Sequence, residues 1–599
     1  MLVRRSKFVS AMALVATGAL VLSACGGGET TSEGSGASQN QRPDDLGAAD
    51  QVFKRPEVKD SGEFTMVRES AFTDYNNGTG AANAFQNTVV LSNVQPSPYF
   101  FELVNGQIVI KLDGDFMDSV DVASTDPMQV VWKIRKEAVW SDGAPVSCKD
   151  FHLQWLAATS QVMVTGDDGA QARVWDTSPT GYDQIEKLTC ADDNKTITTD
   201  FSNPYADYRA LFGPLVPAHI LEEKAGVADI TKLTDSDAAA MTKAAEFFNT
   251  GWIGWDESTG LSAGPYKIQA TNEDETVLVR NDKWWGQQGG PSKVTIRVNN
   301  DAQSAAQQLQ NKEADIIAIQ ADGAVAQQLR SDTAIKTYAA DGQTYEHIDF
   351  RMDLPLFQDK AVREAVAACV DRQDLIDKLV KDVNPNAKPL NNVMFMPNEV
   401  GYEEHYNNTG IGDVEGAKKI LTDAGYTMGG DNVFAKNGQR VSFRLGHRII
   451  ERRSQTVRLI QAHCAPAGIE VIDDQSDNFN DVRLKNADFD MALFAWVGSA
   501  VKSGPFGNFA SADAGGSANY NRYSNKEMDK VFVEANAELD FDKRVALLNQ
   551  VDKLMRADMH ILPLFVLSDF AANTSDVGPI SYVGAFGGVT WNMFAWQRG

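Results

Sequence analysis

The sequence predicts an α/β fold of more than one domain, and three observations support this. Segments that alternate apolar and polar residues, as strands do, take turns along the chain with segments of helical periodicity. The length of 599 residues is enough for two or three domains with a substantial core. A composition of 43% hydrophobic and 23% charged residues is typical of globular rather than disordered chains. We find no internal repeat.

The first clear strand-helix-strand unit lies between residues 128 and 201. MQVVWKIRK (128–136) alternates as a strand does, and KTITTDF (195–201) returns to this pattern. Between them, DFHLQWLAATSQVM (150–163) has helical spacing, and Asp150 is its expected N-cap.

The same alternation continues in the second half of the chain. SKVTIRV (292–298) and ADIIAI (314–319) predict strands on either side of a helix that Asp301 opens. Residues 359–380 and 414–426 predict further helices, and Gly425 is expected to end the last one in the left-handed conformation.

The first 24 residues predict a secretory signal peptide. Three positive charges precede an apolar stretch, Phe8 to Leu22, that is too short to be a comfortable membrane span. Leu22-Ser23-Ala24-Cys25 resembles the bacterial lipobox, in which the cysteine is lipidated and cleavage occurs before it. We therefore expect Cys25 to anchor the mature protein to the membrane through several acyl chains. The alternative is an ordinary signal peptide with a chance cysteine.

Residues 25–52 begin with Cys25 and continue as a polar segment rich in Gly and Ser, which predicts a flexible tether. Such a tether would reach roughly 25–30 Å from the lipid surface. The body is then expected on the extracytoplasmic face of the cell membrane, and no second long apolar run predicts a membrane span within it.

The charge of the mature chain excludes one class of partner. Without residues 1–24 the chain has 52 Lys and Arg against 81 Asp and Glu, a net charge of −29. Such a surface repels nucleic acid and anionic lipid headgroups, and no basic cluster offsets this repulsion. We expect no nucleic-acid partner.

Four cysteines remain in the body, where oxidising conditions favour disulfides. Cys148 follows a turn and Cys190 precedes the strand 195–201, so both are expected in one subdomain and we predict a disulfide between them. Its closed loop would contribute roughly 4 kcal/mol. Cys369 and Cys464 lie on helical segments. The sequence does not decide whether they form a disulfide or remain two buried thiols. No pair has the spacing of a zinc site.

Motifs of nucleotide and hydrolytic chemistry are missing from the sequence. It has neither a phosphate loop nor a G-x-G-x-x-G turn, and neither H-E-x-x-H nor G-x-S-x-G. The seven histidines are scattered, so we expect no metal site and no cofactor, and nickel or haem cargo is not favoured. We predict a protein that is not an enzyme, although its many carboxylates leave an extracellular glycoside hydrolase as an alternative.

Nine segments, taken together and in order, resemble those of a known family. The strongest is Asp-x-x-Val-Arg-x-Ala followed by Asp-Arg, at residues 359–372. The segments are VVWKIRKEAVWSDGAPVSCKDF, SAGPYKI, LVRNDKWWGQQGGPSKVTIRV, FQDKAVREAVAACVDRQDLI, AKKILTDAGY, AGIEV, ADFDMALFAWVGS, YNRYSNKEMDKVF and HILPLF. From about residue 60 to 570 the chain is similar to the extracellular solute-binding proteins of oligopeptide, dipeptide and nickel type that serve ABC importers.

The resemblance implies a two-lobed periplasmic-binding-protein-like fold, the large three-domain variant of type II, with a ligand cleft between the lobes. The expected parts are 53–100 with 205–343 and 575–599 as the core of the first lobe, 101–204 as a domain inserted in it, and 344–574 as the second lobe. Most of the motifs are expected to be structural. Gly143 to Pro145 set a turn, Arg363 is a buried ion-pair partner, and Trp284 and Trp285 hold a surface turn.

The resemblance also implies a function, which is capture of a peptide or related small solute by hinge closure and delivery to an ABC permease by a monomer. In peptide carriers of the family an Asp after the Trp segment pairs with the peptide ammonium. In this chain Trp496 lies at the position of the family tryptophan, but the loop after it has Ser499, Ala500 and Lys502 where the Asp is expected. The candidate ligand contacts are Glu69, Phe72, Tyr75, Asn76, Trp496, Ser499, Phe506, Asn519 and Tyr520. Glu69 could replace the missing acid from the opposite lobe.

A second function stays open beside transport. The aromatic, Asn and Ser side chains would suit a sugar face or an internal peptide segment. The loop sequences also resemble a branch of actinobacterial lipoproteins, and one of these is implicated in phosphatidylinositol-mannoside and lipoarabinomannan assembly. The alternative is therefore a lipoprotein that no longer imports and instead regulates or senses the synthesis of envelope glycolipids.

Overall fold

A computed structural model describes residues 52–104, 107–165, 171–582 and 587–599. The predicted signal peptide, Cys25 and nearly all of the predicted tether lie outside these ranges.

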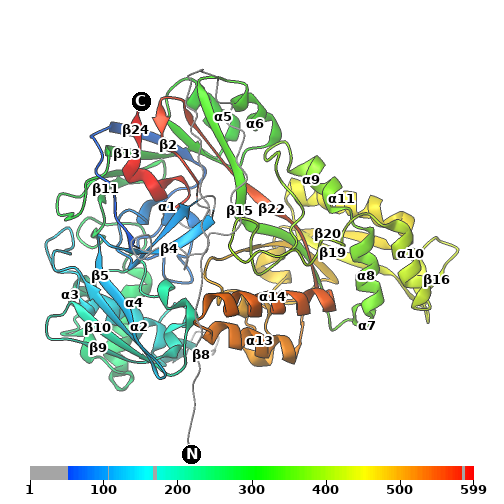
Figure 1. The fold of residues 1–599 in the computed structure, drawn as a ribbon, viewed down its shortest axis with the longest axis horizontal. Coiled ribbons are helices and arrows are strands. Elements are labelled where there is room, and N and C mark those ends of the chain that lie inside the picture. The colour runs from blue at the N-terminus through cyan, green and yellow to red at the C-terminus, as the bar shows by residue number, and fades with distance from the viewer. Residues whose placement is uncertain (1–51, 105–106, 166–170, 583–586) are drawn as a thin grey trace, which may run out of the picture. The chain divides into compact units, whose positions relative to one another are not determined.

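One mixed sheet of ten strands organises the body (Figure 1). In spatial order its strands are β11 (Tyr266–Thr271), β12 (Glu275–Arg280), β13 (Pro291–Val298), β2 (Gly62–Arg68), β14 (Ile316–Ala318), β22 (Ile561–Thr574), β15 (Ile335–Phe350), β21 (Met491–Val497), β19 (Ser442–Arg448) and β20 (Glu470–Ser476). The strands predicted at 292–298 and 314–319 are β13 and β14, which confirms both.

The two longest strands, β15 and β22, join the halves of this sheet. They pair antiparallel from Ile335 opposite Thr574 to Asp349 opposite Ile561, with an irregularity between Asp341 and Tyr345. On one side lie β14, β2 and β13, and on the other lie β21, β19 and β20. We call these parts lobe 1 and lobe 2.

Lobe 1 also contains a four-stranded antiparallel sheet and a three-stranded sheet. The first has the order β5 (Met117–Thr125), β6 (Met128–Ile134), β10 (Thr196–Phe201) and β9 (Ile185–Cys190), and the second β1 (Val52–Phe53), β4 (Gln107–Asp113) and β3 (Tyr99–Val104). Its helices are α1 (Phe85–Leu91), α2 (Cys148–Thr159), α3 (Ala218–Ala225), α4 (Ala238–Thr250), α5 (Ala302–Gln310) and α6 (Gly323–Arg330).

Lobe 2 is richer in helices. They are α7 (Pro355–Gln358), α8 (Lys360–Cys369), α9 (Arg372–Leu379), α10 (Val414–Asp423), α11 (Glu451–Cys464), α12 (Phe506–Phe509), α13 (Lys526–Ala537) and α14 (Phe541–Asp558). The short strands elsewhere are β7 (Met163–Thr165), β8 (Gln171–Arg173), β16 (Thr427–Met428), β17 (Phe434–Lys436), β18 (Gln439–Arg440), β23 (Val577–Gly578) and β24 (Gln597–Arg598).

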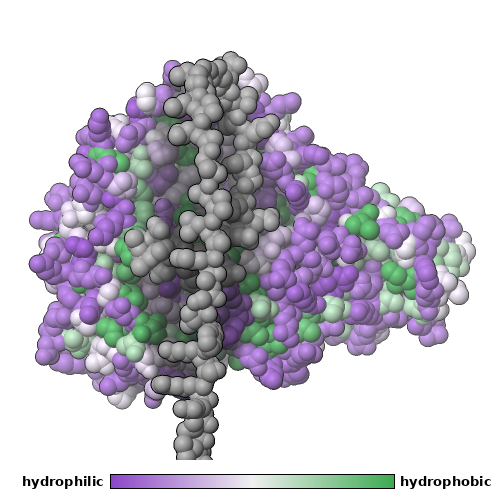
Figure 2. Space-filling model, in the orientation of Figure 1, coloured by the Kyte–Doolittle hydropathy of each residue, from purple (hydrophilic) through white to green (hydrophobic). Residues whose placement is uncertain are grey.

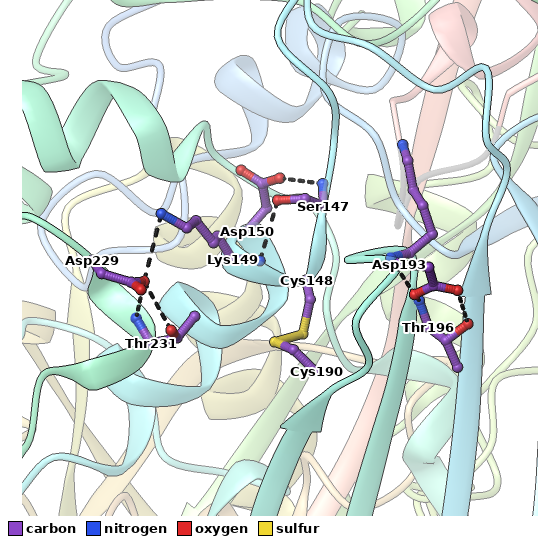
Figure 3. The surroundings of a disulfide bond; sticks show 10 residues. Ser147, Cys148, Lys149, Asp150, Cys190, Asp193, Thr196, Asp229 and Thr231 are labelled. Atoms are coloured by element: carbon purple, nitrogen blue, oxygen red, sulfur yellow. Dashed lines mark hydrogen bonds and ion pairs between the residues drawn. A yellow bond between two sulfur atoms is a disulfide. The ribbon is translucent and has the colours of Figure 1, made fainter.

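The observed ends of the helices can be compared directly with the caps predicted from the sequence. Asp301 caps α5 by accepting the Ser304 N–H at 2.6 Å, and Gly425 follows α10 with φ of +86°, as predicted. The prediction for α2 was three residues late. Ser147 is the N-cap, and Asp150 completes a capping box by accepting the Ser147 N–H at 2.7 Å (Figure 3).

Two disulfides lie within the part of the chain that the structure describes. Cys148 at the start of α2 bonds to Cys190 at the end of β9, with the sulfurs 1.97 Å apart, which is the pair that the sequence singled out (Figure 3). Cys369 and Cys464, for which the sequence left two states open, form the second and join α8 to α11.

Each lobe has its own hydrophobic core. One cluster takes its members from β2, the four-stranded sheet, α2 to α4 and the C-terminal residues up to Trp596. Another lies between α8, α10, α11 and the lobe 2 strands. The largest clusters of buried apolar residues therefore lie in different lobes.

Hydrophilic side chains cover most of the face in Figure 2. Within the described ranges, no helix combines the length and apolarity that crossing a membrane requires.

Candidate functional site

The lobes meet where the loop after β21 approaches a short segment of lobe 1. Asp207, in the segment Ala206–Ala210, receives two hydrogen bonds of 2.6 and 2.7 Å from the Arg544 guanidinium at the start of α14. The Ser503 N–H donates to the same carboxylate at 2.7 Å. Although burial opposes ionisation, Arg544 holds the pKa of Asp207 below its usual range. This buried ion pair links the lobes.

A second buried ion pair lies within lobe 2. Lys502 Nζ is 2.6 Å from Glu399 Oε2 and donates to the Ser499 carbonyl at 2.7 Å. The ammonium also lies 4.9 Å from the centre of the Phe395 ring. The cation that replaces the expected acid is thus neutralised inside its own lobe.

Both pairs contribute to the wall of one cavity of about 200 Å³, which we call the charged cavity. Its lining includes Ile108 and Arg209 from lobe 1, and Glu399, Lys502, Glu538 and Arg544 from lobe 2. Side chains from both lobes therefore line it.

A larger cavity of about 390 Å³, which we call the aromatic cavity, adjoins the first. Its wall is mostly apolar and aromatic, with Leu91, Tyr99, Phe100, Phe101, Pro214, Val501 and Trp591. Neutral polar side chains complete it, among them Asn77, Ser92, Gln95 and Ser97. Arg209 lines both cavities, and Val501 of lobe 2 covers part of the second. This combination of an apolar wall with a few polar groups is typical of small-molecule sites.

None of the nine predicted contact residues is among those lining the two cavities. Several of them lie one or two positions away, because Asn77 follows Asn76 and Ala500 follows Ser499. Glu69 accepts the Gln320 N–H at 2.6 Å, within lobe 1. Whether a ligand touches any of the nine stays a prediction.

Four of the nine are buried and packed or bonded inside their own lobes. Tyr75 is fully buried and donates its hydroxyl to the Leu261 carbonyl. Asn76 donates to the Phe248 carbonyl at 2.8 Å, and Asn519 donates to Ala510 and Tyr523 carbonyls at 2.8 and 2.7 Å. Phe72 belongs to the lobe 1 core. All four side chains are therefore held by contacts within their own lobes.

Three predicted aromatic residues lie in lobe 2. The rings of Trp496 and Tyr520 stack with centroids 5.8 Å apart, and both side chains are partly exposed. Phe506 packs edge-on against Phe532. The structure thus brings Trp496 and Tyr520 together, while Ser499 Oγ accepts the Val501 N–H within the loop.

The cavity residues that sequence reasoning missed include Gln95, Asp207, Arg209, Glu399 and Arg544. Asp207 and Arg544 are 337 positions apart, so no local pattern pairs them. Lys502 did carry a signal, because a cation within an apolar loop requires an acidic partner when it is buried.

The residues of the family motifs make structural contacts, as expected, but the partner of Arg363 is not the one predicted. Arg363 was predicted to form an ion pair, whereas it donates to the Asp558 carbonyl at the end of α14 from two nitrogens, at 3.0 and 2.7 Å. It therefore caps that helix. Trp284 and Trp285 hold their turn through carbonyl oxygens of Gln287 and Asp115.

Two carboxylates lie at the irregularity between β15 and β22. Asp341 accepts a 2.9 Å hydrogen bond from Asn384, and burial raises its pKa to about 6. Burial raises the pKa of Asp569, on the facing strand, to about 7, although Tyr582 opposes the shift. Both acids are in the strands that join the lobes.

Across residues 52–104, 107–165, 171–582 and 587–599, no group of three or more His, Cys, Asp or Glu side chains is placed to hold a metal ion.

Two lobes joined by paired long strands, with cavities where the lobes meet, define the class of periplasmic binding proteins. The chain belongs to the bacterial extracellular solute-binding proteins of family 5, whose model, described as the middle part of the family, matches residues 111–517.

Relatives in mycobacteria extend this likeness. The oligopeptide-binding protein OppA of Mycobacterium tuberculosis is 27% identical over 464 residues, which cover 76% of this chain and 71% of OppA. An uncharacterized lipoprotein of the same organism is 26% identical over 561 residues, covering 90% and 93% of the two chains. The probable monoacyl phosphatidylinositol tetramannoside-binding protein LpqW is 25% identical over 263 residues, or 44% of this chain and 36% of LpqW.

Solved structures share the fold. The periplasmic EDTA-binding protein EppA superposes with a TM-score of 0.78 at 24% identity, covering 91% of this chain and 98% of EppA. The oligopeptide-binding protein AppA of Bacillus subtilis, in complex with a nonapeptide, gives a TM-score of 0.66 at 18% identity, covering 90% of this chain and all of AppA. The two-lobed α/β fold predicted from the sequence is confirmed.

Proposed function

We propose that this chain is the membrane-anchored extracellular solute-binding protein of an ABC importer and captures a peptide or related small polar solute by hinge closure. The observation that carries the proposal is the pair of adjoining cavities at the junction of the lobes, with the Asp207–Arg544 ion pair in the wall of the charged cavity. Ligand contacts that bridge both lobes favour the closed form, because only that form makes them all.

Membership of family 5 supports a role in transport, with an ABC permease as partner. The protein would deliver its ligand unchanged, as a monomer and without catalysis. The lipobox-like sequence at Cys25 and the lipoprotein names of several relatives support a lipid anchor on the extracytoplasmic face.

One measurement tests both parts of this proposal. The mature protein, purified from its own host, is analysed by native mass spectrometry, and any released solute is identified. We expect an acyl mass on Cys25 and a discrete solute or a ladder of peptides. A deletion strain should then lose uptake of that solute. Unchanged uptake would contradict the role in import.

The second candidate is regulation or sensing of envelope glycolipid synthesis. The similarity to LpqW over 44% of the chain favours it, together with the mostly apolar wall of the aromatic cavity. Here the deletion strain would show altered glycolipids with normal solute uptake, and a mannosylated lipid would be released on denaturation.

A further inference from the structure

Two of the cations that line the cavities belong to ion pairs of the wall. Lys502 Nζ lies 2.6 Å from Glu399 Oε2, and Arg544 lies 2.6 Å from Asp207. A ligand anion that displaced either carboxylate would leave a buried acid without its cation, which is strongly unfavourable. Lys502 and Arg544 are therefore poor receptors for a ligand anion.

Arg209 lines both cavities and is held differently. Its side chain is half-buried, so a molecule in the cavity can reach it. Nε donates to Tyr208 Oη at 3.3 Å. Burial raises the pKa of Tyr99, and the charge of Arg209 opposes this rise, so the guanidinium acts on the wall of the aromatic cavity.

A guanidinium can serve several acceptors at once. Arg372 of this chain donates to four backbone carbonyls and to Asn391 Oδ1. Five N–H donors in a planar fork make this possible. A ligand carboxylate can therefore bind Arg209 in addition to the contacts that this side chain already makes.

The rest of the lining of the aromatic cavity carries no charge among the residues that the structure describes. Its rings include Phe100, which is half-buried, and Trp591, whose ring centre lies 6.0 Å from that of Phe100. An ammonium here would meet a like charge and no carboxylate, whereas an anion would gain charge-assisted hydrogen bonds from Arg209. The lining therefore favours a ligand with an apolar group beside a negative charge.

The single cation suits a carboxylate better than a phosphate monoester. A carboxylate carries one negative charge, and its two oxygens match the fork of a guanidinium. A phosphate monoester carries about 1.5 to 2 negative charges at pH 7. The described lining of the aromatic cavity offers no second cation to neutralise it.

We propose that the aromatic cavity binds an apolar monocarboxylate, such as the C-terminal residue of a hydrophobic peptide, and that Arg209 donates to both oxygens of its carboxylate. This inference rests on the proposed function, since it names the ligand class of the same cleft. A ligand held by its carboxylate needs no acidic anchor in the loop after β21, where Ser499, Ala500 and Lys502 replace the Asp of the peptide carriers.

The test compares peptides that differ in charge, on the full mature protein in phosphatidylcholine vesicles. Titration calorimetry is performed with the anion acetyl-Ala-Ala-Phe, with the neutral acetyl-Ala-Ala-Phe-amide and with the cation Ala-Ala-Phe-amide. We expect the anion to bind about tenfold more tightly than the neutral peptide, and the cation to bind most weakly. Equal binding of the anion and the neutral peptide would overturn the inference, and so would failure of the anion to bind.

Phenylacetate and phenyl phosphate separate the two kinds of anion. We expect phenylacetate to bind more tightly, because its single charge matches that of Arg209. The reverse order would assign the cavity to a phosphate and overturn the carboxylate.

Variants locate the effect. Arg209→Gln should weaken acetyl-Ala-Ala-Phe about tenfold and leave the affinity for its amide unchanged, and Arg209→Lys should restore part of the preference. The matched control is Arg297→Gln, which removes an exposed lobe 1 cation beside Glu275 and should change neither affinity. An equal loss for both peptides in Arg209→Gln would show a structural role instead. Thermal unfolding of each variant confirms that it is folded.

Failure of the inference and failure of the proposed function can be told apart. If the neutral peptide binds as tightly as the anion and uptake requires the protein, the role in import stands and the ligand class proposed here is wrong. If the host protein releases no solute and uptake is normal in the deletion strain, the importer role itself is wrong.

Discussion

Arg372 shows how a single side chain can hold several segments together. The guanidinium is buried and donates to four backbone carbonyls and to Asn391 Oδ1, with distances of 2.6 to 3.0 Å. Gly410 allows this close approach, because a Cβ there would lie 2.6 Å from Arg372 Nε. The motif that identified the family therefore marks a structural arginine.

Arg372→Lys should lower the free energy of unfolding by about 3 kcal/mol, because an ammonium cannot replace the bonds of the planar fork and leaves buried carbonyls unpaired. Urea unfolding measures the change. The matched control is Arg458→Lys, whose exposed pair with Glu451 should contribute less than about 0.5 kcal/mol. Equal effects of the two substitutions would contradict this role for Arg372.

Two of the nine predicted contact residues are neighbours in sequence of residues that line the cavities. The sequence predicts Asn76 and Ser499 as contacts, whereas their neighbours Asn77 and Ala500 line the cavities. Alternation along a segment predicts which side chains share a face. Which of the two faces lines a cavity depends on a partner segment that is hundreds of positions away in the sequence. The Asp207–Arg544 pair is the clearest example.

At the scale of the elements, helices and strands are predicted well where a local pattern of residues marks them. The helix after Asp301 and the strands β6, β10, β13 and β14 lie where alternation and caps predicted them. The single helix predicted over residues 359–380 is wrong, because the backbone is extended at Val370 and Asp371 and separates α8 from α9. The start of α2 was misplaced because Ser147 and Asp150 are both good caps, and the capping box uses both. No local sequence pattern predicts that strands of both lobes join in one ten-stranded sheet.

The two disulfides should differ in their contribution to stability. Cys148 and Cys190 close a loop over 42 positions, and Cys369 and Cys464 one over 95. Loop-closure entropy predicts roughly 4 kcal/mol for the first and slightly more for the second. Urea unfolding of the two double alanine variants against the oxidised protein measures this. A loss below about 1 kcal/mol from either would show that the chain-entropy argument fails here.

Asp341 and Asp569 predict a pH dependence of the paired strands. Burial raises their pKa values to about 6 and about 7, above the value of 3.8 for an exposed Asp. Between pH 4 and pH 7 the folded state then binds more protons than the unfolded chain, so stability falls as the pH rises through this window.

Asp569→Asn should remove most of this dependence. We expect the variant to be more stable than the wild type by about 2 kcal/mol at pH 8 and equal to it at pH 4, because both forms are uncharged there. Thermal melting from pH 4 to pH 8 gives both values. Parallel pH profiles for the two proteins would rule out Asp569 as the cause.

At the scale of the whole molecule, the Asp207–Arg544 pair should bias the two lobes towards contact. Arg544→Gln removes the charge that Asp207 needs, so we expect the ligand-free variant to show a larger radius of gyration in X-ray scattering. If the pair contributes about 1.4 kcal/mol to closure, the ratio of closed to open forms falls tenfold.

Arg556→Gln is the control on the same helix, since Arg556 pairs with Glu364 within lobe 2 at 3.1 Å. Its radius of gyration should match the wild type. An unchanged radius for Arg544→Gln as well would mean that the inter-lobe pair has no part in closure.

The placement of β2 and β22 in one sheet affects the order in which the protein can fold. β2 lies near the start of the body, yet β14 beside it pairs with β22 through Ala571 to Asn573, and Ser61 donates to the Trp596 carbonyl at 2.7 Å. Lobe 1 therefore cannot complete its core until the ribosome has made nearly the whole chain, whereas lobe 2 is one continuous stretch. Contacts so distant in sequence form slowly. Late folding of lobe 1 would keep much of the chain without a complete core during synthesis.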